Sequence, residues 1–170
     1  AISIVRGDPR LAETILLDMA DLFRSVLSDE SAVVRLEREI EVANSYIEIE
    51  HLRLGDRLEV EWEVAADVQD VLVPALLLQP LIENAVYHGV ERLEGGATIS
   101  VRIFTRNGTL KIEVVNPVPM DGTPPRPGNR MALENIRERI GLHYDGEAKM
   151  EAKLHEGRFR VAIELPVRRD

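Results

Sequence analysis

The sequence contains no cysteine among its 170 residues. This absence excludes disulfide bonds, catalysis by a thiolate and metal sites built from cysteine ligands. Basic residues are also in deficit, because 21 Lys and Arg stand against 30 Asp and Glu, which leaves a net charge of -9. Binding to nucleic acid is therefore not expected, since a phosphate backbone requires clustered basic side chains. A nucleotide stays compatible with this charge, because magnesium and backbone amides can hold its phosphates.

Long hydrophobic runs and a signal peptide are missing as well. No apolar stretch approaches the roughly 20 residues that a membrane-spanning helix needs. The sequence also lacks a GxSxG motif, a P-loop, a pair of histidines at metal-binding spacing and a Rossmann fingerprint. What it has is 45% hydrophobic and 30% charged residues, in a chain long enough to bury the core of a soluble globular domain.

The apolar residues of the first 54 positions recur at helical spacing. Residues 9–28 predict one helix, with Asp8 and Pro9 as N-cap and first-turn proline. Its apolar seam requires a partner helix, from this chain or from a second copy, and comprises Ala12, Leu16, Met19, Phe23 and Val26. After a break at 28–31 a second helix is expected, with an apolar face of Leu36, Ile40, Ala43, Ile47 and Leu54. We interpret its acidic residues as a solvated face: Glu37, Glu39, Glu41, Glu48 and Glu50.

Beyond Gly55 the apolar period changes to two, and residues 58–64 predict a half-buried strand. We expect a helix that opens at Pro74 and kinks at Pro80, where one backbone hydrogen bond is lost. Strands at 98–104 and 109–115 form a hairpin around Asn107-Gly108, a strong turn signal.

The remaining segments are a loop at 116–130 rich in proline and glycine, a helix at 132–143 and a closing hairpin of 147–154 with 158–165. This order predicts an α+β fold, a two-layer α/β sandwich with helices on one face of a mixed, mainly antiparallel sheet. An N-terminal helical hairpin arm is expected in front of it.

The most informative stretch runs from Leu78 to Gly89. On a helix, Asn84, Tyr87 and His88 gather on the face opposite to an apolar stripe. The Asn84 carboxamide can give one oxygen to a magnesium ion that water and nucleotide phosphates otherwise hold. The alternative is an amphipathic core helix with a polar outer face. Glu83 points about a quarter-turn away from Asn84, so we expect it in a surface salt bridge.

Asn116 follows an apolar strand and is a candidate to accept a hydrogen bond from the adenine amino group. The alternative is an ordinary turn residue before Pro117. The segment 116–130 is the candidate lid over a nucleotide. Gly128 would let the backbone approach phosphate, and the helix that starts at Ala132 would present its amides and positive dipole end.

Three blocks of the sequence, at 36–58, 78–89 and 133–140, resemble the sensor histidine kinases of the LytS/AlgZ-like branch in both order and spacing. Residues 78–89 (LQPLIENAVYHG) are similar to the LQPLVENAxxHG box of that family, and residues 133–140 (LENIRERI) to its GLxNxRERL helix. Residues 36–58 resemble the helix that leads into the catalytic domain. The resemblance covers nearly the whole chain and implies a GHKL-type (Bergerat) ATP-binding domain at 33–170, with a second dimerisation and phosphotransfer helix within 1–32.

The resemblance also implies the ligands, ATP and Mg2+. Asn84 would be the metal ligand and Asn116 the adenine reader. The further expected ATP-binding residues are Tyr87, His88, Gly128, Asn129, Arg130, Met131, Ala132 and Leu133, supported by Asn135.

The chain departs from the family pattern at three places. The aspartate and both glycines of the DxGxG box are lost, with Asn116 in place of the aspartate, and an amide lacks the charge that strengthens such a bond. Of the GxGxGLxN box only Gly128 survives as a glycine. Tyr87 stands where relatives often carry a phosphate-contacting lysine. Arg130 could replace that cation or simply fill the loop, and Pro80 stands where an Hsp90-like ATPase would need an acidic base. A degenerate, non-catalytic dimerisation or interaction module with weak or no nucleotide binding is the alternative function.

None of the four histidines lies on the first predicted helix, where the phosphoacceptor of such a kinase would be expected; they are His51, His88, His143 and His155. The resemblance implies a phosphoacceptor upstream of residue 1, so we expect no catalytic residue within this chain. The start at Ala1 without Met predicts a piece of a longer bacterial protein, a cytoplasmic domain anchored in the inner membrane by segments before residue 1. Implied partners are a second copy, bound through the N-terminal helix, and a response regulator of the LytTR type.

Overall fold

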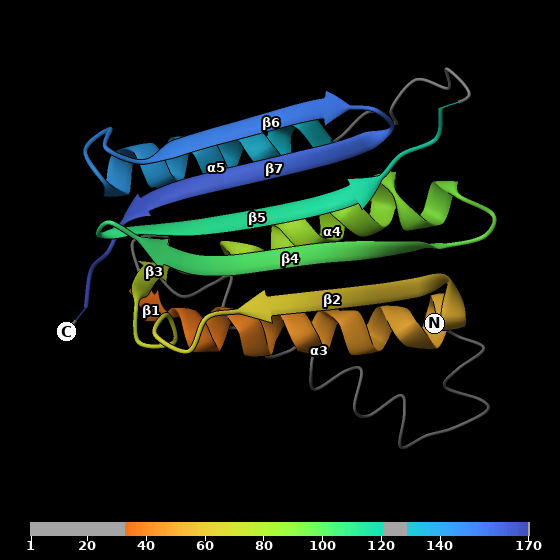
Figure 1. Ribbon diagram of the computed structural model, residues 1–170, viewed down its shortest axis with the longest axis horizontal. Coiled ribbons are helices and arrows are strands. Elements are labelled where there is room, and N and C mark those ends of the chain that lie inside the picture. The colour runs from red at the N-terminus through yellow and green to blue at the C-terminus, as the bar shows by residue number, and fades with distance from the viewer. Residues whose placement is uncertain (1–32, 121–128, 170) are drawn as a thin grey trace.

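The computed structural model describes residues 33–120 and 129–169. The predicted arm within 1–32 and the candidate lid residue Gly128 lie outside this part of the chain. In the described part, three helices form one layer behind a five-stranded sheet (Figure 1). The predicted two-layer α+β sandwich is thereby confirmed. No helix of the described residues is long and apolar enough to cross a membrane.

The elements follow one another in an order that the sequence largely predicts. They are β1 (Val33–Arg35), α3 (Leu36–Leu54), β2 (Leu58–Val64), β3 (Leu72–Pro74), α4 (Leu78–His88), β4 (Ala97–Arg106), β5 (Thr109–Pro117), α5 (Asn129–His143), β6 (Lys149–His155) and β7 (Arg158–Pro166), with 3-10 turns at Gly55–Arg57 and Val90–Arg92.

The main sheet has the strand order β2-β4-β5-β7-β6. β2 pairs with β4 in parallel, and every other neighbouring pair is antiparallel. Alternate residues of the central strands are buried under the helices, namely Ile99, Val101 and Ile103 of β4 and Leu110, Ile112 and Val114 of β5. This period of two places the core between the sheet and the helical layer.

Two antiparallel hairpins have tight turns between their strands. Asn107 and Gly108 join β4 to β5, and both have positive φ values, 52° and 74°. Glu156 and Gly157 join β6 to β7 with 47° and 73°. Positive φ at both central positions is the pattern of a type I′ turn, whose twist matches that of the flanking strands. The Asn-Gly signal in the sequence is therefore confirmed as a hairpin turn.

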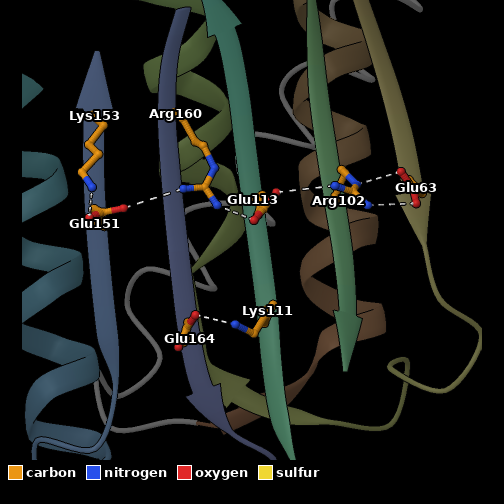
Figure 2. Close-up of polar contacts among 8 residues, drawn as sticks. All are labelled: Glu63, Arg102, Lys111, Glu113, Glu151, Lys153, Arg160 and Glu164. Carbon is orange, nitrogen blue, oxygen red and sulfur yellow. Dashed lines mark hydrogen bonds and ion pairs between the residues drawn. The ribbon is translucent and has the colours of Figure 1, made fainter. Parts of the chain in front are cut away.

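The outer face of the sheet carries charged side chains that pair with one another across the strands (Figure 2). Arg102 contacts Glu63 at 2.8 Å and Glu113 at 3.8 Å, and Arg160 bridges Glu113 and Glu151. We call these five residues the charge ladder. Three acidic and two basic side chains alternate across this side of the sheet, which is therefore its charged face.

Three local predictions require correction. Pro74 does not open the helix: it ends β3, which pairs with β1 in a small sheet that the sequence pattern did not predict, and α4 begins at Leu78. Pro80 lies in the first turn of α4, where backbone N–H groups have no partner within the helix, so the expected loss of a hydrogen bond and kink do not apply. α5 begins at Asn129 rather than at Ala132.

Candidate functional site

α4 is buried around most of its circumference. Its apolar residues pack into the core, yet Asn84 is only 3% exposed and His88 only 9%. These two side chains therefore do not form the polar outer face of an amphipathic helix. A buried carboxamide loses its water contacts, so Asn84 is a polar side chain at a position where packing alone favours an apolar one.

Asn116 is buried at the end of β5, with 1% of its surface exposed. It continues the alternating series of Ile112 and Val114 and so faces the helical layer. Its Nδ2 donates to the carbonyl oxygen of Pro117 at 3.0 Å. Asn116 is thus more than an exposed turn residue: a polar side chain occupies a place where the strand pattern favours an apolar one.

Gly89 brings the end of α4 against the end of β5. A Cβ atom at this position would lie 2.7 Å from the oxygen of Ala85, 2.8 Å from Nδ2 of Asn116 and 2.9 Å from the oxygen of Pro117. Any side chain here would therefore push the helix and the strand apart. The glycine that ends the Asn84 segment is what allows the Asn84 helix and the Asn116 strand to meet at one end of the molecule (Figure 1).

Tyr87 lies on another side of α4. Its ring stacks edge-on against His88, with ring centroids 5.0 Å apart, and it lines a groove of about 310 Å³ between α3 and α4. The groove is further lined by Tyr46, Glu50, Arg53, Glu83, Val86 and Glu91. Glu83 was expected in a surface salt bridge. Its exposed carboxylate instead accepts a hydrogen bond of 2.7 Å from the Gln79 side chain, one helical turn earlier.

The predicted lid residues are described only in part. Residues 129–131 form the first turn of α5, so the backbone there is helical rather than loop. Ala132 and Leu133 are half-buried, and Asn135 is exposed. The structure thus describes the candidate site from the side of α4 and β5, where Asn84, His88 and Asn116 lie.

Sequence reasoning missed Glu39, which it assigned to a solvated face. The Glu39 side chain is 3% exposed, and its two oxygens accept from the backbone amides of Leu76, Leu77 and Leu78 at 2.7, 2.6 and 2.9 Å. Burial raises the pKa of Glu39, although the three amides and the Arg139 guanidinium oppose this rise. The signal was present in the helical spacing, because Glu39 is three residues after Leu36 and on the same buried face.

The residues present are compatible with a magnesium nucleotide. Nowhere in residues 33–120 and 129–169 do three His, Cys, Asp or Glu side chains converge closely enough to hold a metal ion. A magnesium ion in the described part of the chain would take most of its ligands from phosphates and water, which is its usual preference. One buried carboxamide oxygen from Asn84 fits that chemistry.

Comparisons with known proteins point in one direction. Residues 1–58 match the family model described as "Histidine kinase". The sensor histidine kinase BtsS of Escherichia coli (strain K12) is 30% identical over 98% of this chain and 30% of its own length. The sensor protein LytS of Staphylococcus saprophyticus is 24% identical over 96% of this chain and 30% of its own length. The chain therefore spans about 30% of the length of these curated relatives.

Solved structures share the fold. The catalytic domain of histidine kinase ThkA is 17% identical with a TM-score of 0.57, over 82% of this chain and 98% of that domain. Full-length ShkA, solved in complex with AMPPNP, is 15% identical with a TM-score of 0.57, over 82% of this chain and 31% of its own. At these identities the likeness concerns the fold alone.

Proposed function

We propose that this chain is the ATP-binding catalytic region of a two-component kinase, a LytS-like sensor histidine kinase with a GHKL-type catalytic domain. Its similarity to sensor histidine kinases and to the fold of histidine kinase catalytic domains supports this proposal. In the whole protein the γ-phosphate of ATP would pass to a histidine outside this chain and then to an aspartate of a response regulator. The domain that does this work would comprise residues 33–170, with a dimerisation and phosphotransfer helix before it.

The observation that carries the proposal is the pair of buried carboxamides. Asn84 comes from α4 and Asn116 from β5, and both are nearly inaccessible although neither residue type favours burial. Gly89 lets the ends of their two elements meet, because any side chain at this position would clash. The sequence analysis names these two side chains as candidates for metal and adenine, and their placement at adjoining elements supports one shared site.

Each side chain has a definite task in this proposal. Mg-ATP supplies a phosphoryl group whose charge the metal neutralises when it is bound. Asn84 gives one carboxamide oxygen to the metal. Because Nδ2 of Asn116 is engaged by the Pro117 carbonyl, its Oδ1 is the atom left to accept from the adenine amino group. A guanine would present an oxygen to this acceptor and would be rejected.

The ligand and the partners are inferred from the family. A structural neighbour of the same fold, ShkA, was solved with an ATP analogue, which supports nucleotide use by this domain. The relatives are sensor kinases, which supports a second copy and a response regulator as partners. We further propose a regulator of the LytTR type and a whole protein anchored in the bacterial inner membrane, with this region on the cytoplasmic side.

A calorimetric titration of the chain with ATP, with and without magnesium, tests the proposal. We expect magnesium-dependent binding that is abolished by Asn84→Ala. The matched control is Asn44→Ala, which removes an exposed asparagine from α3 and should leave the affinity unchanged.

The two other results separate the alternatives. An Asn84→Ala variant that binds Mg-ATP like the wild type would contradict the proposal that Asn84 is a ligand of the metal. A folded wild-type chain that gives no heat at about millimolar ATP, a limit near -4 kcal/mol, would contradict the proposal and favour the non-catalytic interaction module.

A further inference from the structure

The bend before α4 is held by side chains of two other helices, α3 and α5. Glu39 of α3 accepts from the amides of Leu76, Leu77 and Leu78. At the same segment, the guanidinium of Arg139 on α5 donates to the carbonyl oxygen of Leu76. All three helices of the layer are therefore joined at this one bend.

The bend has local reasons to need such support. The first N–H groups of a helix have no partner within it, and Leu77 at the N-cap position supplies no side-chain cap for α4. Leu76 has a φ of 58°, a left-handed conformation that costs free energy for a residue other than glycine. A carboxylate close to the start of a helix also interacts favourably with the helix dipole. Glu39 therefore caps the start of α4, although it lies 37 or more residues away in the sequence, because no neighbouring side chain does so.

The position of α4 determines where Asn84 stands. Asn84 follows Leu78 by six residues, about 9 Å along a helix that rises 1.5 Å per residue. At the far end of α4, Gly89 lies close against Asn116 and Pro117, where no side chain would fit. The near end is fixed by Glu39 and Arg139, so a helix that is loosened there can rotate or shift Asn84 relative to β5.

We propose that Glu39 and Arg139 are positioning residues for the nucleotide site, because they fix the start of α4 and thereby the place of the Asn84 carboxamide. The inference rests on the proposed nucleotide function. It adds that two residues outside the ligand contacts determine where the proposed metal ligand Asn84 stands. Glu39 comes from α3, and Arg139 comes from α5. Asn116 belongs to the sheet, and its adenine contact does not depend on this bend.

The test compares Glu39→Gln with Glu41→Gln, a matched change at an exposed position of the same helix. The first measurement is made without nucleotide, on the amide exchange of residues 76–78 and on the NMR signal of the Asn84 side-chain amide. In Glu39→Gln we expect faster exchange of these three amides and a shifted Asn84 signal. Glu41→Gln should match the wild type in both.

The second measurement separates positioning from a purely structural role. The affinity of the folded variants for ATP is measured with and without magnesium. We expect Glu39→Gln to weaken Mg-ATP binding about tenfold, a loss near 1.4 kcal/mol, while binding of ATP without magnesium changes far less. A residue that only stabilises the fold would leave the ratio of the two affinities unchanged. Arg139→Lys, which keeps the charge but loses the guanidinium fork, should show the same change of ratio to a smaller degree.

The outcomes are distinguishable from those of the proposed function. Wild-type values of the affinity ratio and of the Asn84 signal in Glu39→Gln would overturn the inference. A wild-type chain that binds no nucleotide would contradict the proposed function. The inference would then be tested only by the NMR signal of the Asn84 side-chain amide: a shift in Glu39→Gln would support it, and an unchanged signal would overturn it. If Glu39→Gln does not fold, the same two measurements are made on Arg139→Lys: the ratio of the ATP affinities with and without magnesium, and the NMR signal of the Asn84 side-chain amide.

Discussion

At the residue scale, the contact between α4 and β5 depends on the missing side chain of Gly89. We predict that Gly89→Ala lowers the free energy of unfolding by about 1–3 kcal/mol, the usual cost of forcing an extra methyl group into a packed site. The added Cβ would approach the Ala85 oxygen, the Asn116 amide and the Pro117 oxygen to less than 3 Å. Urea denaturation followed by circular dichroism measures the change.

Gly141 offers the matched control for this prediction. It lies within α5, and a Cβ there would meet nothing within 4 Å. Gly141→Ala should therefore stabilise the chain by about 0.5–1 kcal/mol through the better helix propensity of alanine. Equal effects of the two substitutions would show that Gly89 is not a close-contact position.

Glu39 links stability to pH with a definite sign. Burial raises the pKa of its carboxyl in the folded state above 4.5, against the opposing effect of three amides and Arg139. The resulting contribution to stability is complete below the unfolded pKa of 4.5 and is lost as the pH rises through the folded value. The free energy of unfolding of the wild type minus that of Glu39→Gln should therefore fall as the pH is raised from below 4.5.

Denaturant titrations of the two proteins at a series of pH values measure this difference. A difference that grows with pH would mean that the folded chain binds the proton less tightly than the unfolded chain, and that the amide donors outweigh burial.

Candidate site residues could be singled out from the sequence where they stand against a local apolar pattern. Asn84 and Asn116 could be singled out from their segments, because each interrupts an apolar pattern or lies at its end. Glu39 was misread, although helical spacing places it beside Leu36 and Ala43 on the buried face. Its partners are backbone amides near residue 77, and no spacing within α3 could indicate them.

At the element scale, the charge ladder lies on the face of the sheet that the helices do not cover (Figure 2). Glu113 stands at its centre between Arg102 and Arg160. We predict that Glu113→Gln causes a small loss of stability at low salt that disappears near about 1 M salt, where the Debye length is about 3 Å. Thermal denaturation at the two salt concentrations measures it.

The matched control is Glu61→Gln on the exposed side of β2, for which no ion pair is seen within the described residues. Its effect should be smaller and independent of salt. A loss for Glu113→Gln that persists undiminished at high salt would mean that packing, and not charge pairing, is what the carboxylate provides.

The regular elements were predictable because their apolar periods are long and unbroken, as in β4, β5 and α3. The small sheet of β1 and β3 was not, because strands of three residues are too short for a period to show. Pro74 by itself favours a helix start, and no local signal in its segment contradicts that. The bend that delays α4 to Leu78 is stabilised by Glu39 and Arg139, which are distant in sequence.

At the scale of the whole molecule, the N-terminal seam predicts a dimer. The seam residues at 12–26 lie outside the described part of the chain, so the prediction rests on the sequence pattern and on the family. We expect the 170-residue chain to sediment as a dimer and Leu16→Glu to sediment as a monomer. Asp18→Asn, a change off the seam on the same predicted helix, should stay dimeric. A monomeric wild-type chain at tens of micromolar would contradict the predicted seam, because a specific dimer typically has a Kd of about micromolar or below.

Mg-ATP binding by a site that spans two elements is the central claim, and the side-chain amide signals of Asn84 and Asn116 report on it directly. NMR spectra of the labelled chain are recorded with an ATP analogue, first without and then with magnesium. The signal of Asn116 should shift with the nucleotide alone, and that of Asn84 should shift further only when magnesium is added. Signals that stay unmoved under both conditions, or an Asn84 signal indifferent to magnesium, would contradict the assignment of these two buried carboxamides to adenine and metal.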